Sequence, residues 1–189
     1  MKAKGAENLK FRCTGCGNCC REPLLPLTDG DIRRIKERTG DAAADIVRWV
    51  DRHGIEMDDE PEAFVMLRQG KRVMVLGHQN GACRYLGKDA RCTIYDARPL
   101  GCRLYPFDPD WDSNGKLRRL KIVRATECPN EMDGKTKVSD LKALDDRYQQ
   151  AHRDLNAKIA EWNGVQRKRK RGGKAAQTAK EFLVFLGLA

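Results

Sequence analysis

Residues 11–20 read FRCTGCGNCC, and this stretch decides what kind of fold the chain can form. Four of its residues are cysteines: Cys13, Cys16, Cys19 and Cys20. A Cys-x-x-Cys step lets two sulfurs converge on one centre while the backbone turns between them. Gly15 and Gly17 favour such turns because glycine accepts positive φ. Two consecutive steps supply three sulfurs, a pattern typical of zinc and iron–sulfur ligands.

The chain contains eight cysteines, and the other four are Cys83, Cys92, Cys102 and Cys128. The first residues, MKAKGAENLKF, carry charge but lack the apolar segment of a secretory signal, so we expect a cytoplasmic protein. Disulfides are rare in reducing compartments. The cysteines therefore predict metal or cluster ligation, although their even count is also compatible with a secreted disulfide framework. No apolar run approaches the ~20 residues that span a bilayer, so we expect no membrane partner.

The triple step is similar to the start of the ferredoxin pattern C-x₂-C-x₂-C-x₃-C-P, whose last Cys-Pro occurs here only at Cys128. One grouping is therefore Cys13, Cys16 and Cys19 with Cys128, and Cys20 with Cys83, Cys92 and Cys102. Adjacent side chains in extended chain point to opposite sides, so Cys19 and Cys20 would serve two neighbouring centres. Alternatively, one is a spare thiol, or the two form a redox-active disulfide. Zinc remains an alternative to an iron–sulfur cluster, because four-cysteine zinc sites also begin with a Cys-x-x-Cys step.

Arginine and tyrosine accompany the second group of cysteines in CRYLGKDARCTIYDARPLGCRLYPFDP, residues 83–109. Arg98 and Arg103 would offset the negative charge of thiolates and donate hydrogen bonds to sulfur, or else they are surface arginines. We expect Tyr95 and Tyr105 to pack around the ligand loops and keep water away. The alternative is an aromatic platform for a substrate.

The pattern of the remaining chain predicts an α+β fold with a β-hairpin, a short antiparallel sheet and helices. Helices are expected at 27–40, capped by Thr28 and ended by Gly40, and at 41–54. The apolar runs of 63–77 predict a hairpin, and 117–125 predicts a strand after a loop that contains Pro106 and Pro109.

Three parts are expected along the chain: a cysteine-cluster metal-binding domain at 1–135, an amphipathic helix at 136–163, and a basic linker with a short apolar segment at 164–189. Apolar residues recur at helical spacing from Leu141 to Trp162, and Ser139 is a candidate N-cap. We expect this helix to pack on the domain, the alternative being a helix that binds a partner.

The formal net charge is +10, and the densest basic run is RKRKR at 167–171. Such a run is either a solvated tail or a binding site for nucleic acid or another polyanion. No aromatic residue interleaves with it, so a base-stacking surface is not indicated and nucleic acid is not favoured. The partner, a protein or a small molecule, is left unidentified by the sequence.

The order of the motifs resembles a known family. FxCxxCxxCC is followed by CxxL from Cys83, by CxIYxxRPxxCRxxP from Cys92 to Pro106, and by Cys128. This resembles the CxxCxxCC or YkgJ-type cysteine-cluster family over about residues 9–130. The resemblance implies chelation of zinc or iron, a 4Fe-4S cluster included, with a role in electron transfer, metal handling or sensing.

A flagellin lysine methylase carries a related domain. The resemblance therefore implies, as an alternative, a cluster-dependent enzyme that modifies proteins. The chain has no glycine-rich nucleotide loop after a strand, so no methyl-donor site is recognised. Catalysis is accordingly left open by the sequence.

Overall fold

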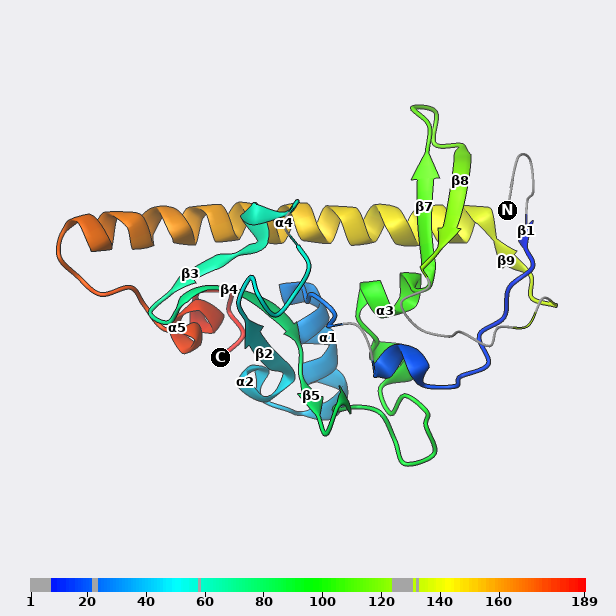
Figure 1. Ribbon diagram of the computed structural model, residues 1–189, viewed down its shortest axis with the longest axis horizontal. Coiled ribbons are helices and arrows are strands. Elements are labelled where there is room, and N and C mark those ends of the chain that lie inside the picture. Colours follow the sequence, from blue (N-terminus) through cyan, green and yellow to red (C-terminus); the bar gives the residue numbers. More distant parts are fainter. Residues whose placement is uncertain (1–7, 22–23, 58, 124–130, 132) are drawn as a thin grey trace. The chain divides into compact units, whose positions relative to one another are not determined.

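The computed structural model describes residues 8–21, 24–57, 59–123, 131 and 133–189 (Figure 1). The chain divides into two compact units, one of Met1–Pro23 with Gln79–Gln149 and one of Leu24–His78 with Gln150–Ala189. Both combine helices with short antiparallel strands, which confirms the predicted α+β class. The long helix α4 (Val138–Arg171) contributes residues to both units.

The first unit carries the cysteines on short elements. Its strands pair as β1 with β9, β6 with β5, and β7 with β8, and the first residue of β5, His78, is counted with the second unit. Its core joins Leu9, Phe11, Leu104, Phe107 and Leu141, and the rings of Phe11 and Phe107 meet edge to face at 4.8 Å between centroids. The bounds are β1 (Asn8–Leu9), η1 (Asn18–Cys20), β5 (His78–Gln79), β6 (Ala82–Cys83), η3 (Tyr95–Ala97), α3 (Leu100–Leu104), β7 (Phe107–Trp111), β8 (Leu117–Ile122) and β9 (Thr136–Lys137).

The predicted strand at 117–125 is confirmed over Leu117–Ile122 as β8, and its last two residues lie outside the described ones; the loop predicted before it is wrong in part. Residues 107–111 form strand β7, in which Pro109 lies opposite Leu120. Proline cannot donate to a ladder, so it is tolerated in strands that have an open edge. β7 has such an edge, because β8 is its only neighbour in this two-stranded sheet among the residues that the structure describes.

The second unit is built on a three-stranded antiparallel sheet in the order β2-β4-β3. The predicted hairpin is confirmed as β3 and β4, which pair from Val65 with Arg72 to Leu67 with Gly70. Val73 and Val75 of β4 pack with Val50 and Phe64 in one core cluster. The bounds are α1 (Asp29–Thr39), α2 (Ala43–Ile46), β2 (Val47–Val50), η2 (Pro61–Ala63), β3 (Val65–Leu67), β4 (Gly70–Leu76) and α5 (Ala179–Phe185).

The helix predicted at 27–40 is confirmed with its caps. Thr28 accepts a hydrogen bond from the backbone N–H of Asp31, and the Asp31 carboxylate accepts one from the backbone N–H of Thr28. Gly40 ends the helix at φ 75°. Local capping chemistry thus places both ends of α1.

The helix predicted at 41–54 is wrong beyond Ile46. α2 ends there, and Val47–Val50 continues as β2 paired with β4, Val47 opposite Leu76 and Val50 opposite Val73. β-Branched and aromatic side chains pack well on a half-buried sheet. The apolar strand β4 offers such a surface, and this distant pairing prevails over the helical spacing of Ile46, Trp49 and Val50.

α4 begins at Val138 and continues to Arg171, beyond the predicted end at 163. Ser139 therefore lies inside the helix and not at its N-cap, and the basic residues 167–171 are helical. Leu155, Ile159 and Trp162 of its second part are buried, at 5%, 1% and 4% exposure. None of the helices in the described ranges is long and apolar enough to cross a membrane.

Candidate metal centre

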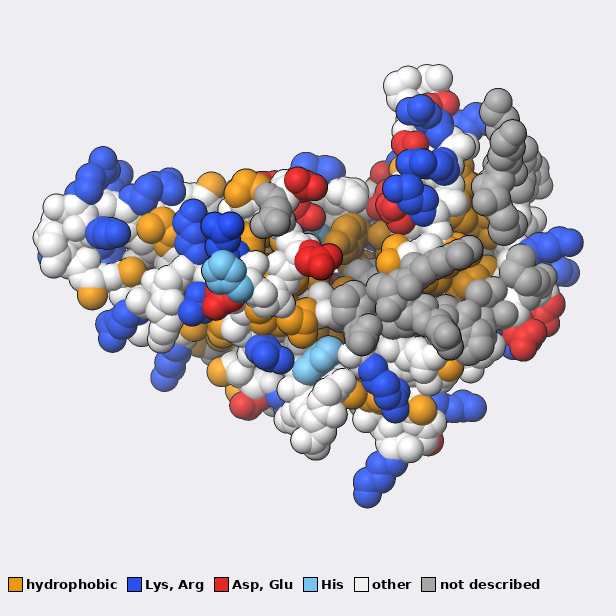
Figure 2. All heavy atoms as spheres, in the orientation of Figure 1, with side chains coloured by type: hydrophobic (Ala, Val, Ile, Leu, Met, Phe, Trp, Pro, Cys, Tyr) orange, Lys and Arg blue, Asp and Glu red, His pale blue; other side chains and the backbone are white. Residues whose placement is uncertain are grey.

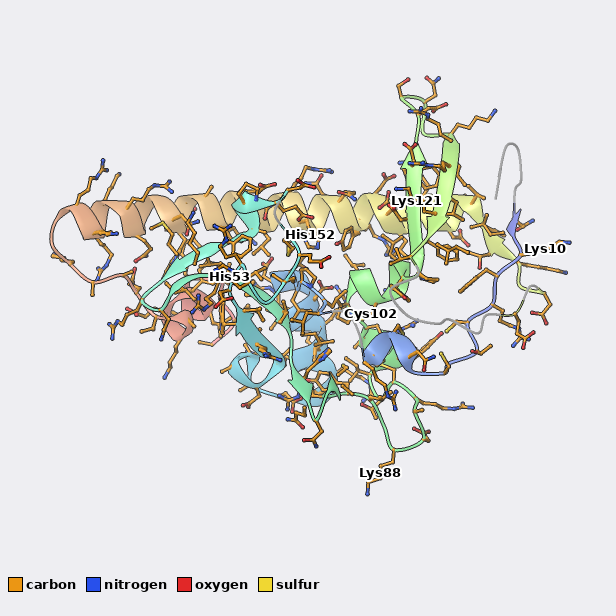
Figure 3. The ribbon with its side chains drawn as sticks, viewed as in Figure 1. Lys10, His53, Lys88, Cys102, Lys121 and His152 are labelled. Atoms are coloured by element: carbon orange, nitrogen blue, oxygen red, sulfur yellow. The ribbon has the colours of Figure 1, made fainter. Side chains whose placement is uncertain are left out.

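The described cysteines all belong to the first unit, and none of them forms a disulfide. Cys128 lies outside the described residues. Cys13 and Cys16 precede η1, which carries Cys19 and Cys20; Cys83 ends β6, Cys92 follows the next loop, and Cys102 lies on α3. Figure 3 shows Cys102 beside η1, in agreement with the electrostatic interaction between the Cys102 and Cys19 thiols.

Glycine determines how the first cysteines turn. Gly15 and Gly17 have φ 70° and 74°, which confirms the turns expected from the sequence. A Cβ atom at Gly17 would lie 2.6 Å from the carbonyl oxygen of Ala90 and 3.0 Å from Cδ1 of Leu86. Gly17 therefore allows the start of η1 to lie directly against the loop between Cys83 and Cys92.

That loop is closed by its own backbone. The Gly87 N–H donates to the Arg91 carbonyl at 2.7 Å, and the Thr93 N–H donates to the Tyr85 carbonyl at 2.9 Å. Leu86 and Cys92 form an antiparallel bridge across it. Cys83 and Cys92 are thereby held at the two ends of one tight loop.

Four thiols interact with one another: those of Cys19, Cys83, Cys92 and Cys102, called here the cysteine quartet. Every pair among the four is coupled electrostatically. Burial raises the pKa of Cys102, and negative charge on Cys83, Cys19 and Cys92 raises it further. Burial likewise gives the largest contribution to the raised pKa values of Cys83 and Cys92. Without a metal these thiols therefore favour the neutral form.

Cys19 and Cys20 are adjacent on η1, and their thiols share a hydrogen bond. The grouping expected from the sequence placed Cys20 with Cys83, Cys92 and Cys102, and it stays a prediction; in the structure the Cys19 thiol interacts electrostatically with these three. A hydrogen bond shared with the Cys20 side chain is the largest cause of the raised pKa of Cys19. Cys20 thus contacts the quartet through Cys19.

Backbone N–H groups point at three of the sulfurs. The N–H of Gly15 donates to Sγ of Cys13 at 3.4 Å, and that of Tyr85 donates to Sγ of Cys83 at 3.5 Å. The N–H of Ile94 makes the same bond to Cys92 and lowers the pKa of its thiol. Donors to sulfur favour the thiolate, which is the form that binds metal.

These three donors were not predicted from the sequence. Each belongs to the second residue after a cysteine, and none of the three is a proline, which would lack the N–H. A residue other than proline two positions after each of these cysteines is the only sign of the donors that the sequence contains.

Arg98 lies beside the quartet. Its positive charge lowers the pKa values of the Cys19, Cys92 and Cys102 thiols. Its Nε donates to the Tyr95 carbonyl at 2.9 Å, and its guanidinium lies over the Tyr95 ring at 3.7 Å from the centroid. Arg84, which was not predicted as a site residue, likewise lowers the pKa of the Cys83 thiol through its positive charge.

The other residues expected around the ligands are placed differently. Tyr95 is 55% exposed, so the expectation that it packs around the loops and excludes water is wrong. Its exposed ring instead supports the guanidinium of Arg98. Arg103 is exposed on α3, and Tyr105 is half-buried just after it. A contribution of these two residues to the centre stays a prediction.

Within the described part of the chain, no three His, Cys, Asp or Glu side chains converge closely enough to hold one metal ion. The donor chemistry nevertheless fits zinc and iron, because soft thiolates suit both. Metal ligands commonly gather only when the metal binds, and binding then displaces their protons. The quartet thiols already interact electrostatically, and metal binding would have to bring them closer together.

Comparison with known proteins agrees with this chemistry. A family model named CxxCxxCC, described as "Putative zinc- or iron-chelating domain", matches residues 12–131. No curated protein and no solved structure is significantly similar to the chain. The matched range contains every cysteine and covers well over half of the sequence. The chain therefore belongs to the CxxCxxCC family of zinc- or iron-chelating domains.

Proposed function

We propose that this protein binds an iron–sulfur cluster or a zinc ion through the cysteine quartet of Cys19, Cys83, Cys92 and Cys102. The observation that carries the proposal is the mutual electrostatic coupling of all four thiols. Four thiolates complete the ligand set of a structural zinc ion or of a 4Fe-4S cluster. Such a centre would serve electron transfer, metal handling or sensing.

The residues around the quartet support the same proposal. Four thiolates accumulate more negative charge than one divalent ion offsets. Arg98 and Arg84 reduce that excess, as their effects on the cysteine pKa values indicate. The N–H groups of Tyr85 and Ile94 donate to two of the sulfurs. Charge and hydrogen bonds around the sulfurs are the means by which a protein adjusts the potential or affinity of such a centre.

The remaining cysteines form a second proposed ligand group of Cys13, Cys16 and Cys128, with Cys20 next to it. Glu131 pairs with Arg12, the residue before Cys13, through backbone hydrogen bonds of 2.9 and 3.1 Å. Cys128 precedes Glu131 by only three positions in the sequence. This pairing supports the proposal that Cys128 joins Cys13 and Cys16 in one ligand group.

Anaerobic purification followed by metal analysis and a visible spectrum tests the function. We expect stoichiometric iron or zinc, with absorbance near ~400 nm and acid-labile sulfide if the centre is an iron–sulfur cluster. Cys102→Ser should lose the quartet's metal, whereas Cys20→Ser should keep it. Intact thiols without stoichiometric iron or zinc, or equal losses in the two variants, would contradict the proposal.

A further inference from the structure

A groove with a volume of about 350 Å³ lies between the C-terminal part of α4 and α5 in the second unit. Its lining is mostly apolar and consists of Trp162, Val165, Gln177, Glu181, Val184 and Phe185. None of these residues belongs to the unit that carries the cysteines. The proposed metal-binding function therefore does not account for the groove.

Aromatic packing fixes the floor of the groove. Trp162 is buried, and its Nε1–H donates to the Met66 carbonyl at 2.9 Å. The ring of Phe185 lies 5.4 Å from that of Trp162 and 6.0 Å from that of fully buried Phe182, measured between centroids. Phe185 is thus held by the core although 39% of its surface is exposed. A preformed apolar surface costs a ligand little reorganisation.

Exposed apolar side chains gather at this groove. Val165, Val184 and Phe185 are 47%, 55% and 39% exposed, and they make up half of the large hydrophobic residues found exposed in the described residues. Single exposed apolar residues are ordinary, but a cluster around a hollow is typical of an interaction site.

Positive charge surrounds the same place. Lys168 and Arg169 follow Val165 by one helical turn, and Lys180 precedes Val184 by one turn, so each shares a helix face with a groove residue. Residues 164–189 contain seven Lys or Arg residues and one Glu. Figure 2 shows Lys and Arg side chains gathered over the C-terminal end of α4.

The two acidic residues nearby do not cancel this charge. The Glu181 carboxylate accepts hydrogen bonds from the backbone N–H of Thr178 at 2.7 Å and from its hydroxyl at 2.8 Å, so it is engaged in capping α5. Glu161 precedes Val165 by one turn. The positive charge is therefore concentrated toward the Arg171 end of α4.

We propose that the groove binds an acidic amphipathic helix of a partner protein. An apolar side chain of that helix enters the hollow between Val165, Val184 and Phe185, and its carboxylates face Lys168, Arg169 and Lys180. Helices commonly dock in this way through residues spaced by three or four. The inference is independent of the metal centre, because it uses only residues of the other unit.

Charge and shape favour this occupant over others. A second copy of the chain would bring another net charge of +10 against the same basic surface. Nucleic acid would use the charge but not the two exposed valines. A bilayer is approached by protruding apolar residues, whereas these residues line a hollow.

Selection from a phage library of random 12-residue peptides against the full-length protein tests the proposal. We expect enriched peptides that combine Asp or Glu with apolar residues at spacings of three or four. The binding of a fluorescein-labelled consensus peptide is then measured by anisotropy. The double variant V165Q/V184Q and the double variant K168Q/K180Q should each weaken it by about tenfold or more.

Ile122→Gln is the matched control, because Ile122 is also an exposed apolar residue but lies on β8 of the first unit. It should bind the peptide like the unaltered protein. Circular dichroism confirms that each variant is folded. Peptides without acidic residues, or binding that V165Q/V184Q leaves unchanged, would overturn the proposal.

Two further outcomes of the same comparison would also overturn it. Flotation with phosphatidylserine-containing vesicles that depends on Val165 and Val184, without any acidic peptide consensus, would identify a membrane surface. Binding of a DNA duplex that K168Q/K180Q weakens and V165Q/V184Q does not, again without a peptide consensus, would identify a polyanion site.

Discussion

The guanidinium of Arg98 lies 3.7 Å from the centre of the Tyr95 ring, on the surface of the cysteine-bearing unit. A hydrogen bond to the Tyr95 carbonyl fixes its orientation as well. From this position its charge lowers the pKa values of Cys19, Cys92 and Cys102. Tyr95 thus supports a cation that favours the metal-binding form of three thiols.

Arg98→Gln should weaken metal binding, because it removes this charge without removing a ligand. Residues that support metal ligands typically contribute about 10- to 100-fold in affinity, and we expect a loss in that range. Competition with a chelator at fixed pH measures it. Arg91→Gln is the control, since Arg91 is exposed and precedes Cys92 directly in sequence. Equal affinities for the two variants would contradict the role of Arg98.

Gly17→Ala should destabilise the protein more than Gly15→Ala. Both glycines have positive φ, so both variants carry a backbone cost of about 1 kcal/mol or somewhat more. Only at Gly17 would the new Cβ meet another atom closely, the Ala90 oxygen at 2.6 Å. Overpacking of this kind adds about 1–3 kcal/mol. The free energy of unfolding in urea separates the two variants.

The same pair of variants tests whether η1 must lie against the loop from Cys83 to Cys92. Displacing η1 moves Cys19 away from the other quartet thiols, so Gly17→Ala should also retain less metal than Gly15→Ala. Equal stability together with equal metal content would show that the contact of Gly17 with this loop does not matter.

His152 should make the protein less stable in mild acid. Burial lowers the pKa of this histidine, and nearby Asp31 offsets only part of the effect. The unfolded chain therefore takes up a proton near pH ~6.5, whereas the folded chain does so only at lower pH. The contribution of neutral His152 to the free energy of unfolding is fully present above pH ~6.5 and declines as the pH falls below that value.

His152→Gln should flatten this decline. Urea unfolding followed by tryptophan fluorescence at pH ~7.5 and ~5.5 measures the decline, the two values lying on either side of the ordinary histidine pKa. His53→Gln, at an exposed histidine, serves as the control for every other effect of acid. A decline as steep in the His152 variant as in the control would show that burial of His152 is not its cause.

Thr28→Ala should cost more stability than Thr178→Ala. Both threonines cap a helix and form the same reciprocal pair with an acidic residue, Asp31 or Glu181. Thr28 is 1% exposed, so loss of its hydroxyl also leaves the buried backbone N–H of Asp31 without its acceptor. We expect about 2 kcal/mol for Thr28→Ala and about 1 kcal/mol or less for Thr178→Ala, from thermal or urea unfolding. Equal costs would contradict the importance of burial.

Features that depend on local chemistry could be predicted from the sequence. The capping box of α1 and the positive φ of Gly15 and Gly17 follow from short-range rules. β2 could not be predicted in this way, because its pairing with β4 gives its side chains a burial that the helical spacing does not reveal. β7 was missed because Pro109 argues against a strand unless the strand has an open edge, and only the structure reveals that edge.

In the candidate site, too, residue types could be predicted from the sequence but long-range contacts could not. The sequence identified the cysteines and Arg98, because residue type alone indicates metal chemistry. It grouped Cys20 with the distant cysteines and did not predict that the Cys19 thiol also interacts with them. That outcome depends on the direction of each side chain in η1 and on the close packing of Gly17 against Ala90. Long-range geometry of this kind leaves no periodic signal in the sequence.

X-ray absorption at the metal edge of the anaerobically purified protein tests the central claim most directly. If the quartet holds the centre, the nearest shell consists of sulfur at about 2.3 Å from the metal. The metal content per chain should fall by the quartet's share in Cys102→Ser and stay unchanged in Cys20→Ser. A nearest shell of nitrogen or oxygen, or a metal content per chain that Cys102→Ser leaves unchanged, would contradict the claim.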